Sequence, residues 1–317
     1  MLQFNRKIFL SIVTLLTIIV FIIAYLFYVM PINGHRVFGV TYMTMNNPFY
    51  EIINNELKKN IEKNGDRLIT LDPQLDIDKQ NKQIYSFIEQ KVDGIFINPI
   101  DAKKNEPALK AAKKAHIPII TVDAPVTNKD LVNCTVVSDN YNAGVQCAKD
   151  MMSKLKSANI VLLKHTTALS AKQRIEGFLD TIDAHSEYKI INQGECKGQL
   201  EKAMPVMQRI LKETPEVDVV MALNDPSALG ALAALESMGY EDVMVYGVDG
   251  TPDIKSLIEE SPMVAGTVAQ SPISIGKIAA KNMYDLLSGK EIGSNIVIPV
   301  EIITKENIAQ FNKTGWQ

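Results

Sequence analysis

Two short apolar stretches, Ile117-Pro-Ile-Ile-Thr-Val122 and Val243-Met-Val-Tyr-Gly-Val248, each end directly before an aspartate, Asp123 and Asp249. Apolar stretches of this length are typical of strands that are buried on both faces of a parallel sheet. A carboxylate at the carboxyl end of such a strand faces the crevice in which open α/β sheets bind their ligands. The two stretches therefore predict both a fold class and the position of a binding site.

Amide side chains take the same place after other predicted strands. These residues are Asn47, Asn98 and Asn224. Carboxylate and amide groups form hydrogen bonds with hydroxyls, and amides both donate and accept them. Carboxylates and amides gathered at strand ends therefore indicate a site for a small polyhydroxylated ligand.

The length and composition favour two α/β lobes. A chain of 317 residues can bury two substantial cores. Charged residues make up 22% of the chain, the net charge is −3 and the two signs are mixed, so no nucleic-acid-binding footprint is present. Strand–helix units that begin near Val37 and again near Asn159 suggest two lobes of similar construction.

Strands and helices are predicted to alternate along the chain, which is typical of parallel sheets with helices on both faces. The predicted strands are Arg36–Thr44, Arg67–Leu71, Val92–Asn98, Ile117–Val122, Cys134–Val137, Asn159–Leu163, Lys189–Asn192, Val217–Leu223, Val243–Val248, Val264–Thr267 and Ile296–Ile302. The predicted helices are Phe49–Lys63, Asn140–Leu155, Ala168–Ile182, Gln199–Leu211, Pro226–Met238 and Ser274–Leu287.

The cysteines and histidines point to no metal or cofactor. Cys134, Cys147 and Cys196 lack metal-ligand spacing and are interpreted as buried free thiols, with a disulfide between the first two left open. The scattered histidines, His165 among them, are interpreted as ordinary surface or loop residues. The glycine-rich loops that bind nucleotides are absent from the sequence, so we expect no cofactor.

The amino terminus predicts a membrane anchor. Ile8 to Met30 is uncharged and mostly aliphatic, and as a helix it would span roughly 34 Å, enough to cross a hydrocarbon core of about 30 Å. Arg6 and Lys7 precede this stretch, which places the amino terminus in the cytoplasm and the chain after Pro31 outside. No Ala-x-Ala cleavage pattern follows, so an uncleaved signal anchor is favoured over a cleaved signal peptide.

Eight short motifs, in order along the chain, resemble those of the ribose-type periplasmic sugar-binding proteins. They are Met45-Asn-Asn-Pro-Phe-Tyr50, Ile97-Asn-Pro-Ile-Asp101, Ile117-Pro-Ile-Ile-Thr-Val-Asp123, Ser138-Asp-Asn140, Arg174-Ile-Glu-Gly-Phe178, Ala222-Leu-Asn-Asp225, Gly247-Val-Asp-Gly-Thr-Pro-Asp253 and Ala269-Gln-Ser-Pro272. The resemblance implies the type I solute-binding fold, in which two doubly wound parallel-sheet lobes close over a sugar and three chain crossings form the hinge.

The same resemblance implies domain boundaries. Residues 1–35 would hold a cytoplasmic tip, the transmembrane helix and a linker. The first lobe would comprise residues 36–137 and 271–299, and the second lobe residues 138–270 and 300–317.

The sugar contacts of that family are expected at eight positions of this chain. They are Asn47, Phe49, Tyr50, Asp123, Arg174, Asn224, Asp249 and Gln270. The side-chain chemistry agrees with this, because aromatic rings pack on sugar faces, carboxylates accept from hydroxyls, amides donate and accept, and a guanidinium donates to several oxygens.

Each of these positions also has a purely structural interpretation. Asn47 could start a helix, Phe49 and Tyr50 could belong to the core, Asp249 could form a plain turn, and Arg174 could pair with a nearby carboxylate. For the last case, the neighbours are Glu176 and Asp180.

Two departures from the family pattern bear on the ligand. Ala124 stands where an arginine often follows the aspartate of the first lobe, and Gly198 stands where an aromatic residue is expected in the second lobe. The sequence therefore leaves the ligand open among pentoses, hexoses and related polyols.

Three functions are considered. The first is a membrane-anchored, extracytoplasmic sugar-binding protein that presents a monosaccharide to an ABC permease. The second is a sugar receptor that signals to a membrane histidine kinase. The third is a glycosidase with Asp123 and Asp249 as its acid/base pair, although the resemblance implies no enzymatic activity.

Overall fold

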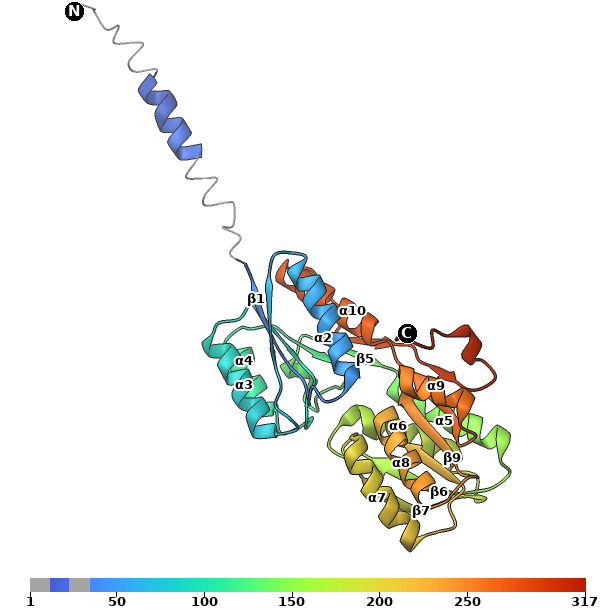
Figure 1. The fold of residues 1–317 in the computed structure, drawn as a ribbon. Coiled ribbons are helices and arrows are strands. Elements are labelled where there is room, and N and C mark those ends of the chain that lie inside the picture. Colours follow the sequence, from blue (N-terminus) through green and yellow to red (C-terminus); the bar gives the residue numbers. More distant parts are fainter. Residues whose placement is uncertain (1–11, 23–34) are drawn as a thin grey trace, which may run out of the picture. The chain divides into compact units, whose positions relative to one another are not determined.

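The computed structural model describes residues 12–22 and 35–317 (Figure 1). Residues 12–22 are helical and belong to a unit separate from the one that runs from Val37 to Gln317. Large apolar side chains of this helix are exposed, for example Leu15 at 59% and Phe21 at 72%. Among the described residues, no helix combines the length and the apolar character needed to cross a membrane. The predicted anchor, Ile8 to Met30, extends beyond the described residues at both ends.

A sheet of six parallel strands forms the first lobe, in the spatial order β11-β5-β4-β3-β1-β2. The strands are β1 Val37–Thr41, β2 Arg67–Leu71, β3 Gly94–Ile97, β4 Ile119–Val122, β5 Cys134–Ser138 and β11 Asn295–Ile298.

A second sheet of six strands forms the second lobe, in the order β12-β10-β9-β8-β6-β7. Its strands are β6 Ala158–Lys164, β7 Tyr188–Glu195, β8 Val219–Ala222, β9 Met244–Asp249, β10 Val264–Ala269 and β12 Glu301–Ile303. Strand β12 is antiparallel to β10, and the other pairs are parallel. Two doubly wound α/β lobes are therefore present, as the sequence predicted.

One predicted strand is wrong. The sequence predicts a single strand over Ile296–Ile302, whereas the structure has β11 and β12 there, in different sheets. Pro299 lies between them and has no N–H to donate to a ladder. The chain leaves the first sheet at this proline and enters the second sheet two residues later.

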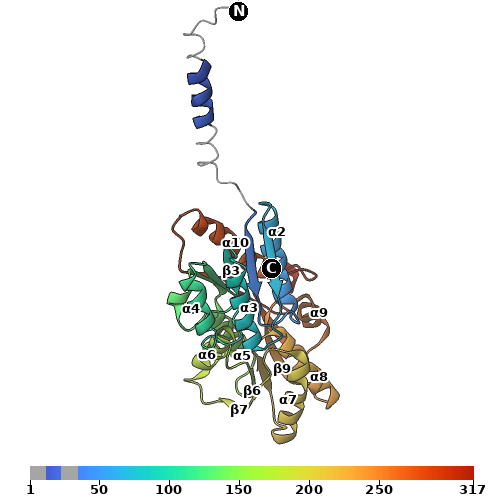
Figure 2. The ribbon, with the colours of Figure 1, turned by 90° about the vertical axis from the view of Figure 1, so that its left-hand side faces the viewer.

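Helices cover both faces of each sheet (Figures 1 and 2). The first lobe has α2 Pro48–Glu62, α3 Ile77–Glu89, α4 Glu106–Lys114 and α10 Pro272–Leu287. The second lobe has α5 Asn140–Lys154, α6 Leu169–Ile182, α7 Leu200–Glu213, α8 Asp225–Ser237 and α9 Pro252–Glu260. One short 3₁₀ turn, Lys129–Leu131, lies between β4 and β5, and another, Ile308–Gln310, follows β12. The sequence predicts all of the longer helices except α3, α4 and α9.

Alternating side chains bury both faces of each sheet. In β3, Phe96 packs with α2 and α10, while its neighbour Ile95 packs with α3 and α4. In β6, Leu162 packs with α5 and α6, while Leu163 faces α7 and α8. This double burial explains why the strands are nearly continuous apolar stretches in the sequence.

Helices α5 and α6 pack closely because each contributes a glycine to their contact. A Cβ atom on Gly144 would lie 1.8 Å from the carbonyl oxygen of Arg174, and one on Gly177 would lie 2.0 Å from that of Tyr141. The position of α6, which carries Arg174, therefore requires a residue without a side chain at Gly144.

We expect Gly144→Ala to lower the free energy of unfolding by about 1–3 kcal/mol, because the added methyl group meets backbone and not a flexible side chain. Urea denaturation measures this change. Gly293→Ala is the matched control, since the nearest atom to its Cβ would be 3.8 Å away. Equal stabilities for the two variants would contradict the expectation.

Candidate functional site

A cavity lies where strand ends of the two lobes face each other. Seven of the eight predicted ligand residues line it: Asn47, Phe49, Tyr50 and Asp123 from the first lobe, and Arg174, Asn224 and Asp249 from the second. All seven are buried. The eighth, Gln270, lies directly behind the cavity wall, where its Nε2 donates to Oδ1 of Asp249 at 2.7 Å.

The two aspartates that the strands present have unusual backbone conformations. Asp123 follows β4 with φ of 65°, and Asp249 ends β9 with φ of 146°. Positive φ is uncommon outside glycine, and such positions cost about 1–3 kcal/mol each and cluster at functional sites. The fold therefore holds both carboxylates at the cavity against the local backbone preference.

Arg174 on α6 lies between the two aspartates. Its Nη1 is 3.6 Å from Oδ1 of Asp249, and its Nη2 is 3.9 Å from Oδ1 of Asp123. Two further bonds hold the guanidinium in place: Nε donates to Oδ1 of Asn140 at 2.8 Å, and Nη1 donates to the carbonyl of Leu223 at 2.9 Å. One cation thus joins carboxylates from both lobes without a close hydrogen bond to either.

The alternative local pairing of Arg174 is wrong. Glu176 lies 3.6 Å from Lys172, and Asp180 accepts a hydrogen bond from the Tyr141 hydroxyl at 3.0 Å. Both carboxylates are engaged with other side chains, so Arg174 is free to face the cavity.

Three buried acceptor atoms at the site have no hydrogen-bond partner: Oδ1 of Asp123, Oδ2 of Asp249 and Oε1 of Gln270. The other carboxylate oxygen of Asp123 accepts from Asn98 at 3.1 Å, so each aspartate has one engaged and one open oxygen. Buried acceptors without partners are rare and cost about 1–3 kcal/mol each. Their clustering indicates a ligand that brings several O–H or N–H donors.

Asn47 and Asn224 cap helices as well as lining the cavity. Oδ1 of Asn47 accepts from the backbone N–H of Phe49 at 3.0 Å. Oδ1 of Asn224 accepts from both N–H and Oγ–H of Ser227, and its Nδ2 donates to the carbonyl of Gly198. The expectation that these amides both donate and accept at the ligand is therefore wrong for Asn224, whose oxygen is fully used and whose remaining group is an N–H.

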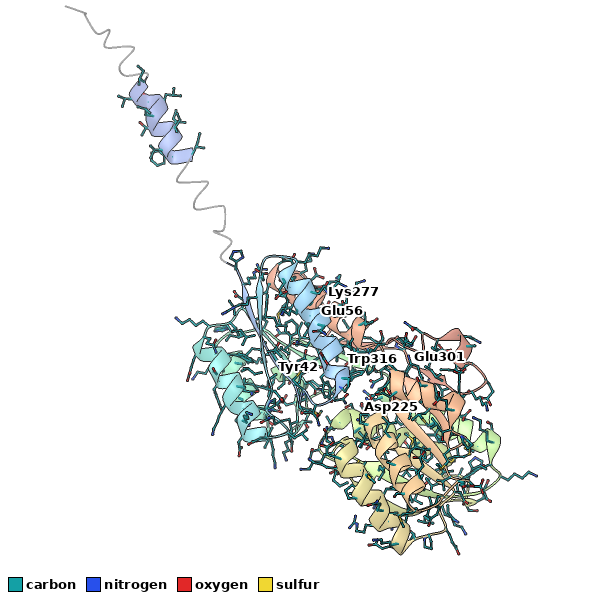
Figure 3. The ribbon with its side chains drawn as sticks, viewed as in Figure 1. Tyr42, Glu56, Asp225, Lys277, Glu301 and Trp316 are labelled. Carbon is teal, nitrogen blue, oxygen red and sulfur yellow. The ribbon has the colours of Figure 1, made fainter. Side chains whose placement is uncertain are left out.

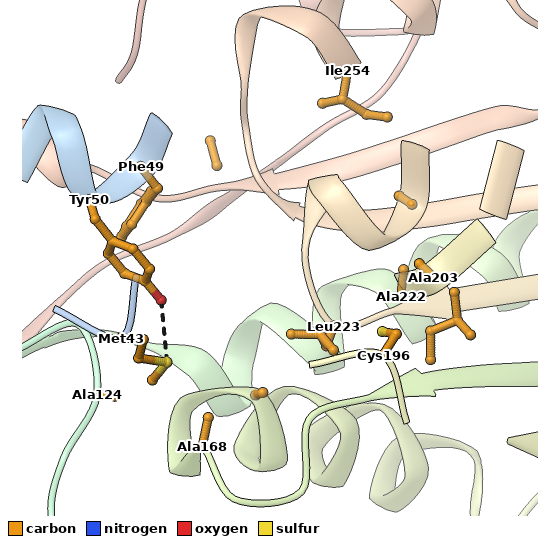
Figure 4. Close-up of a cluster of buried hydrophobic side chains, with 14 of the residues drawn as sticks. Met43, Phe49, Tyr50, Ala124, Ala168, Cys196, Ala203, Ala222, Leu223 and Ile254 are labelled. Carbon is orange, nitrogen blue, oxygen red and sulfur yellow. Dashed lines mark hydrogen bonds between the residues drawn. The ribbon is translucent and has the colours of Figure 1, made fainter. Parts of the chain in front are cut away.

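Phe49 and Tyr50 serve the core and the cavity together. They begin α2, meet edge to face at 5.8 Å and are only 2% and 8% exposed. The Tyr50 hydroxyl contacts Sδ of Met43 at 3.6 Å, which is the dashed line in Figure 4. The core interpretation and the site interpretation of these rings are compatible.

The cavity has further lining residues that the sequence did not single out. They are Met43, Thr44, Leu75, His165, Ala168, Ser170, Ala171, Lys197, Gly198, Gln199 and Leu223. His165 directly follows β6, and Lys197 comes two residues after β7, so the strand-end pattern used for Asp123 would have found both.

His165 lies in the loop after β6, in line with the loop alternative of its interpretation, but it is not a surface residue. Its side chain is 6% exposed, and its Nε2 lies 3.2 Å from Oγ1 of Thr167. Burial lowers the pKa of its imidazole, which is therefore neutral at pH 7.

Gly198 explains why the second lobe carries no aromatic residue at this position. Its φ is 69°, and a Cβ there would lie 3.1 Å from Nδ2 of Asn224. A side chain would be strained and would press on the amide that faces the ligand. The Phe and Tyr rings that line the cavity therefore come from the first lobe alone.

Two buried carboxyl groups, Asp123 and Asp249, lie beside the Arg174 guanidinium, and a third, Asp225, lies near Asp249. Burial raises the pKa of Asp123, although Arg174 and Asn98 oppose this effect. Burial and the nearby Asp225 raise the pKa of Asp249 well above its ordinary value. Burial also raises the pKa of Asp225 to about 6, despite hydrogen bonds from Thr267 and Thr251.

These shifts predict that the ligand-free protein loses stability as pH rises from about 4 through 6. The unfolded carboxyls ionise near pH 4, while the folded ones keep their protons to higher pH, so stability falls with pH in this window. Asp225→Asn should flatten that slope, because it removes one of the titrating carboxyls. The local structure should be kept, because an amide can still accept from the Thr251 N–H and donate to Oγ1 of Thr267. Urea midpoints at pH 5 and 7.5 test this, and an unchanged slope in the variant would refute it.

The cysteines agree with the sequence interpretation, and Cys134, Cys147 and Cys196 are all buried and free. Within residues 12–22 and 35–317, no group of three or more His, Cys, Asp or Glu side chains is placed to hold a metal ion.

Comparison with known proteins agrees with this geometry. A family model described as a periplasmic binding protein domain matches residues 38–291. The ribose import binding protein of Bacillus subtilis is 32% identical over 270 residues, which cover 84% of this chain and 87% of that protein. The ribose import binding protein of Escherichia coli is 32% identical over 83% of this chain and 88% of its own length. The chain therefore belongs to the periplasmic binding protein family.

Solved structures show the same fold. A solute-binding protein from Bacillus halodurans with bound myo-inositol has a TM-score of 0.81 at 28% identity, over 87% of this chain and 97% of that one. The arabinose-binding component from Shewanella sp. ANA-3 has a TM-score of 0.81 at 27% identity, over 86% and 93%. Members of this family bind substrates and are not enzymes, so the glycosidase interpretation of Asp123 and Asp249 finds no support.

Proposed function

We propose that this protein is an extracytoplasmic receptor that closes over one monosaccharide, a pentose or hexose, and presents it to an ABC importer. The observation that carries the proposal is the set of open, buried acceptors on Asp123, Asp249 and Gln270 around a shared guanidinium. A ring polyol supplies several O–H donors within a few ångströms, which is what such a set requires.

Each predicted residue has a role in this proposal. Asp123 and Asp249 accept from neighbouring hydroxyls as charge-assisted bonds, which are stronger than neutral ones. Arg174 donates to hydroxyl or ring oxygens through the N–H groups that no protein acceptor engages. Phe49 and Tyr50 pack against one face of the sugar.

The remaining amides complete the ring of polar contacts. Asn224 donates, because its oxygen is fully used in capping α8, whereas Asn47 donates and can also accept, because its oxygen accepts only one bond. Gln270 accepts through its open Oε1. Hydroxyl donors stabilise the ionised form of Asp249, so sugar binding is expected to lower the pKa of this carboxyl and to release protons.

Binding by closure follows from where these groups lie, half on each lobe. Few direct bonds join the lobes at the cavity mouth; among them are Asn46 Nδ2 to Gln199 Oε1 at 3.3 Å and the Ala102 N–H to the Thr167 carbonyl at 3.4 Å. A sugar that bridges both lobes shifts the population toward the closed form by its difference in affinity for the two states. The lobe boundaries near residues 137, 270 and 299 stay a prediction.

The relatives support a cyclic polyol as the ligand class, since they are described as binding ribose, myo-inositol or arabinofuranose. Ala124 provides no side-chain donor and Gly198 no aromatic ring. The ligand contacts should therefore differ at these two positions from those of the ribose-type binding proteins. Ligands that lack a hydroxyl should bind poorly, because the acceptor they leave stays buried and unpaired.

The ligand class is tested with the chain from Arg36 onward. A thermal-shift screen of pentoses, hexoses and inositols should show a rise in melting temperature for at least one, because that sugar binds the folded form only. Asp249→Ala should then weaken binding by about 2–4 kcal/mol, or roughly 30- to 1,000-fold in Kd, by calorimetry. Asp242→Ala, exposed before the start of β9, is the matched control. An unchanged Kd for Asp249→Ala would remove this residue from the site.

The proposal includes a membrane anchor formed by Ile8 to Met30. The support is the uncharged sequence of this stretch and the exposed apolar side chains of its described part, residues 12–22. An anchor that stays attached also suits the second candidate, a sugar receptor beside a histidine kinase. Affinity purification from detergent-solubilised membranes separates the two, since it recovers either permease or kinase.

We expect the full chain, carrying a carboxyl-terminal tag, to sediment with membranes, to resist extraction by high salt and to dissolve in detergent. The chain that starts at Arg36 should stay in the soluble fraction, because it lacks the apolar stretch. Release of the full chain by salt alone, or a shortened product in the soluble fraction, would contradict an uncleaved anchor.

A further inference from the structure

The chain after the last 3₁₀ turn brings the only tryptophan of the sequence to the binding site. The ring of Trp316 meets the ring of Phe49 edge to face, with centroids 5.6 Å apart and planes at 65°. Phe49 lines the cavity, whereas Trp316 does not. Figure 3 shows Trp316 beside the amino-terminal end of α2. Trp316 therefore supports a cavity wall from behind.

The segment that carries Trp316 is fixed to the second lobe. Lys255 on α9 is fully buried, and its ammonium donates to the carbonyls of Asn312 and Gly315. A buried ammonium needs such acceptors, since burial without hydrogen bonds is very costly. An ion pair between Lys313 and Glu259, at 2.6 Å, adds a second attachment to α9.

The contact between Trp316 and Phe49 consequently joins the two lobes. Phe49 belongs to α2 of the first lobe, and Trp316 is held by α9 of the second. Trp316 also lines a surface groove shared by Pro48 of the first lobe and by Pro226 and Pro252 of the second. Separation of the lobes would move α2 away from α9 and break the ring contact.

We infer that Trp316 is a positioning residue for sugar binding, which presses the Phe49 ring toward the ligand and holds the lobes closed. The inference rests on the proposed function, because it concerns the same cavity. Trp316 acts through Phe49 and touches no ligand itself. Its contact is gained on closing, so its loss weakens binding while the separate lobes stay intact.

Calorimetry with ribose, myo-inositol and arabinose as probes tests this in the full chain in detergent. For a probe that binds, Trp316→Ala should raise Kd about 3- to 10-fold, the range expected for loss of one edge-to-face ring pair. Trp316→Phe should restore most of the affinity, because it keeps an aromatic edge. Tyr85→Ala, which removes an exposed ring on α3 away from the cavity, is the control and should leave Kd unchanged.

A double-mutant cycle tests the route of the effect. In a Phe49→Leu background, Trp316→Ala should change Kd much less than in the native chain, because its partner ring is already absent. The urea midpoint of the sugar-free protein should be the same with and without Trp316→Ala. The emission of Trp316 in the native chain should change on addition of sugar, with the same midpoint as the calorimetric titration.

The outcomes are distinct. If none of the probes and no other sugar binds the native chain, the proposed function fails and this inference falls with it. If a sugar binds and Trp316→Ala leaves its Kd unchanged, the inference alone is overturned. An equal loss of affinity in the native and Phe49→Leu backgrounds also overturns it, because Trp316 would then act independently of Phe49.

Discussion

The arrangement of Arg174 between Asp123 and Asp249 is the constraint on which the rest of the site depends. A buried guanidinium must be paired, and here carboxylates from both lobes supply the pairing at 3.6 and 3.9 Å. At these distances the charges attract each other, but no hydrogen bond forms between the guanidinium N–H groups and the carboxylate oxygens. Asn140 and the Leu223 carbonyl hold the cation so that it cannot move onto either carboxylate. Donors and acceptors consequently remain open toward the cavity.

Much of this arrangement could be predicted from the sequence, for a physical reason. Parallel strands buried on both faces are nearly continuous apolar stretches, so their carboxyl ends can be located to within a few residues. Because those ends face one crevice, Asp123 and Asp249 follow directly from the pattern. The limits have other causes. Helices α4 and α9 are only nine residues long, too short for a helical period to stand out, and α3 is missed although Ile84 and Phe87 form an apolar face. Only Pro299 marks the change of sheet between β11 and β12.

The roles of individual polar residues were harder to predict, because they depend on contacts between distant parts of the chain. Asn98 and Asn224 both follow strands, yet Asn98 lies beneath Asp123 and holds its Oδ2, while Asn224 faces the cavity. His165 also directly follows a strand and lines the cavity, so its position after β6 was the available signal. A position at a strand end therefore shows that a residue lies at the crevice. It does not show whether the side chain faces the cavity or holds another side chain in place.

Under the proposed function, the closed site is costly without a sugar, and this cost couples binding to closure. Three acceptors lose water on closing without gaining a partner, at about 1–3 kcal/mol each. In an open form, water reaches the same atoms and removes the penalty. A sugar supplies the missing O–H donors only when both lobes surround it, since the acceptors on Asp123 and Asp249 lie on different lobes. The unpaired acceptors thus favour the open form in the absence of ligand, and the same atoms make closure around a polyol favourable.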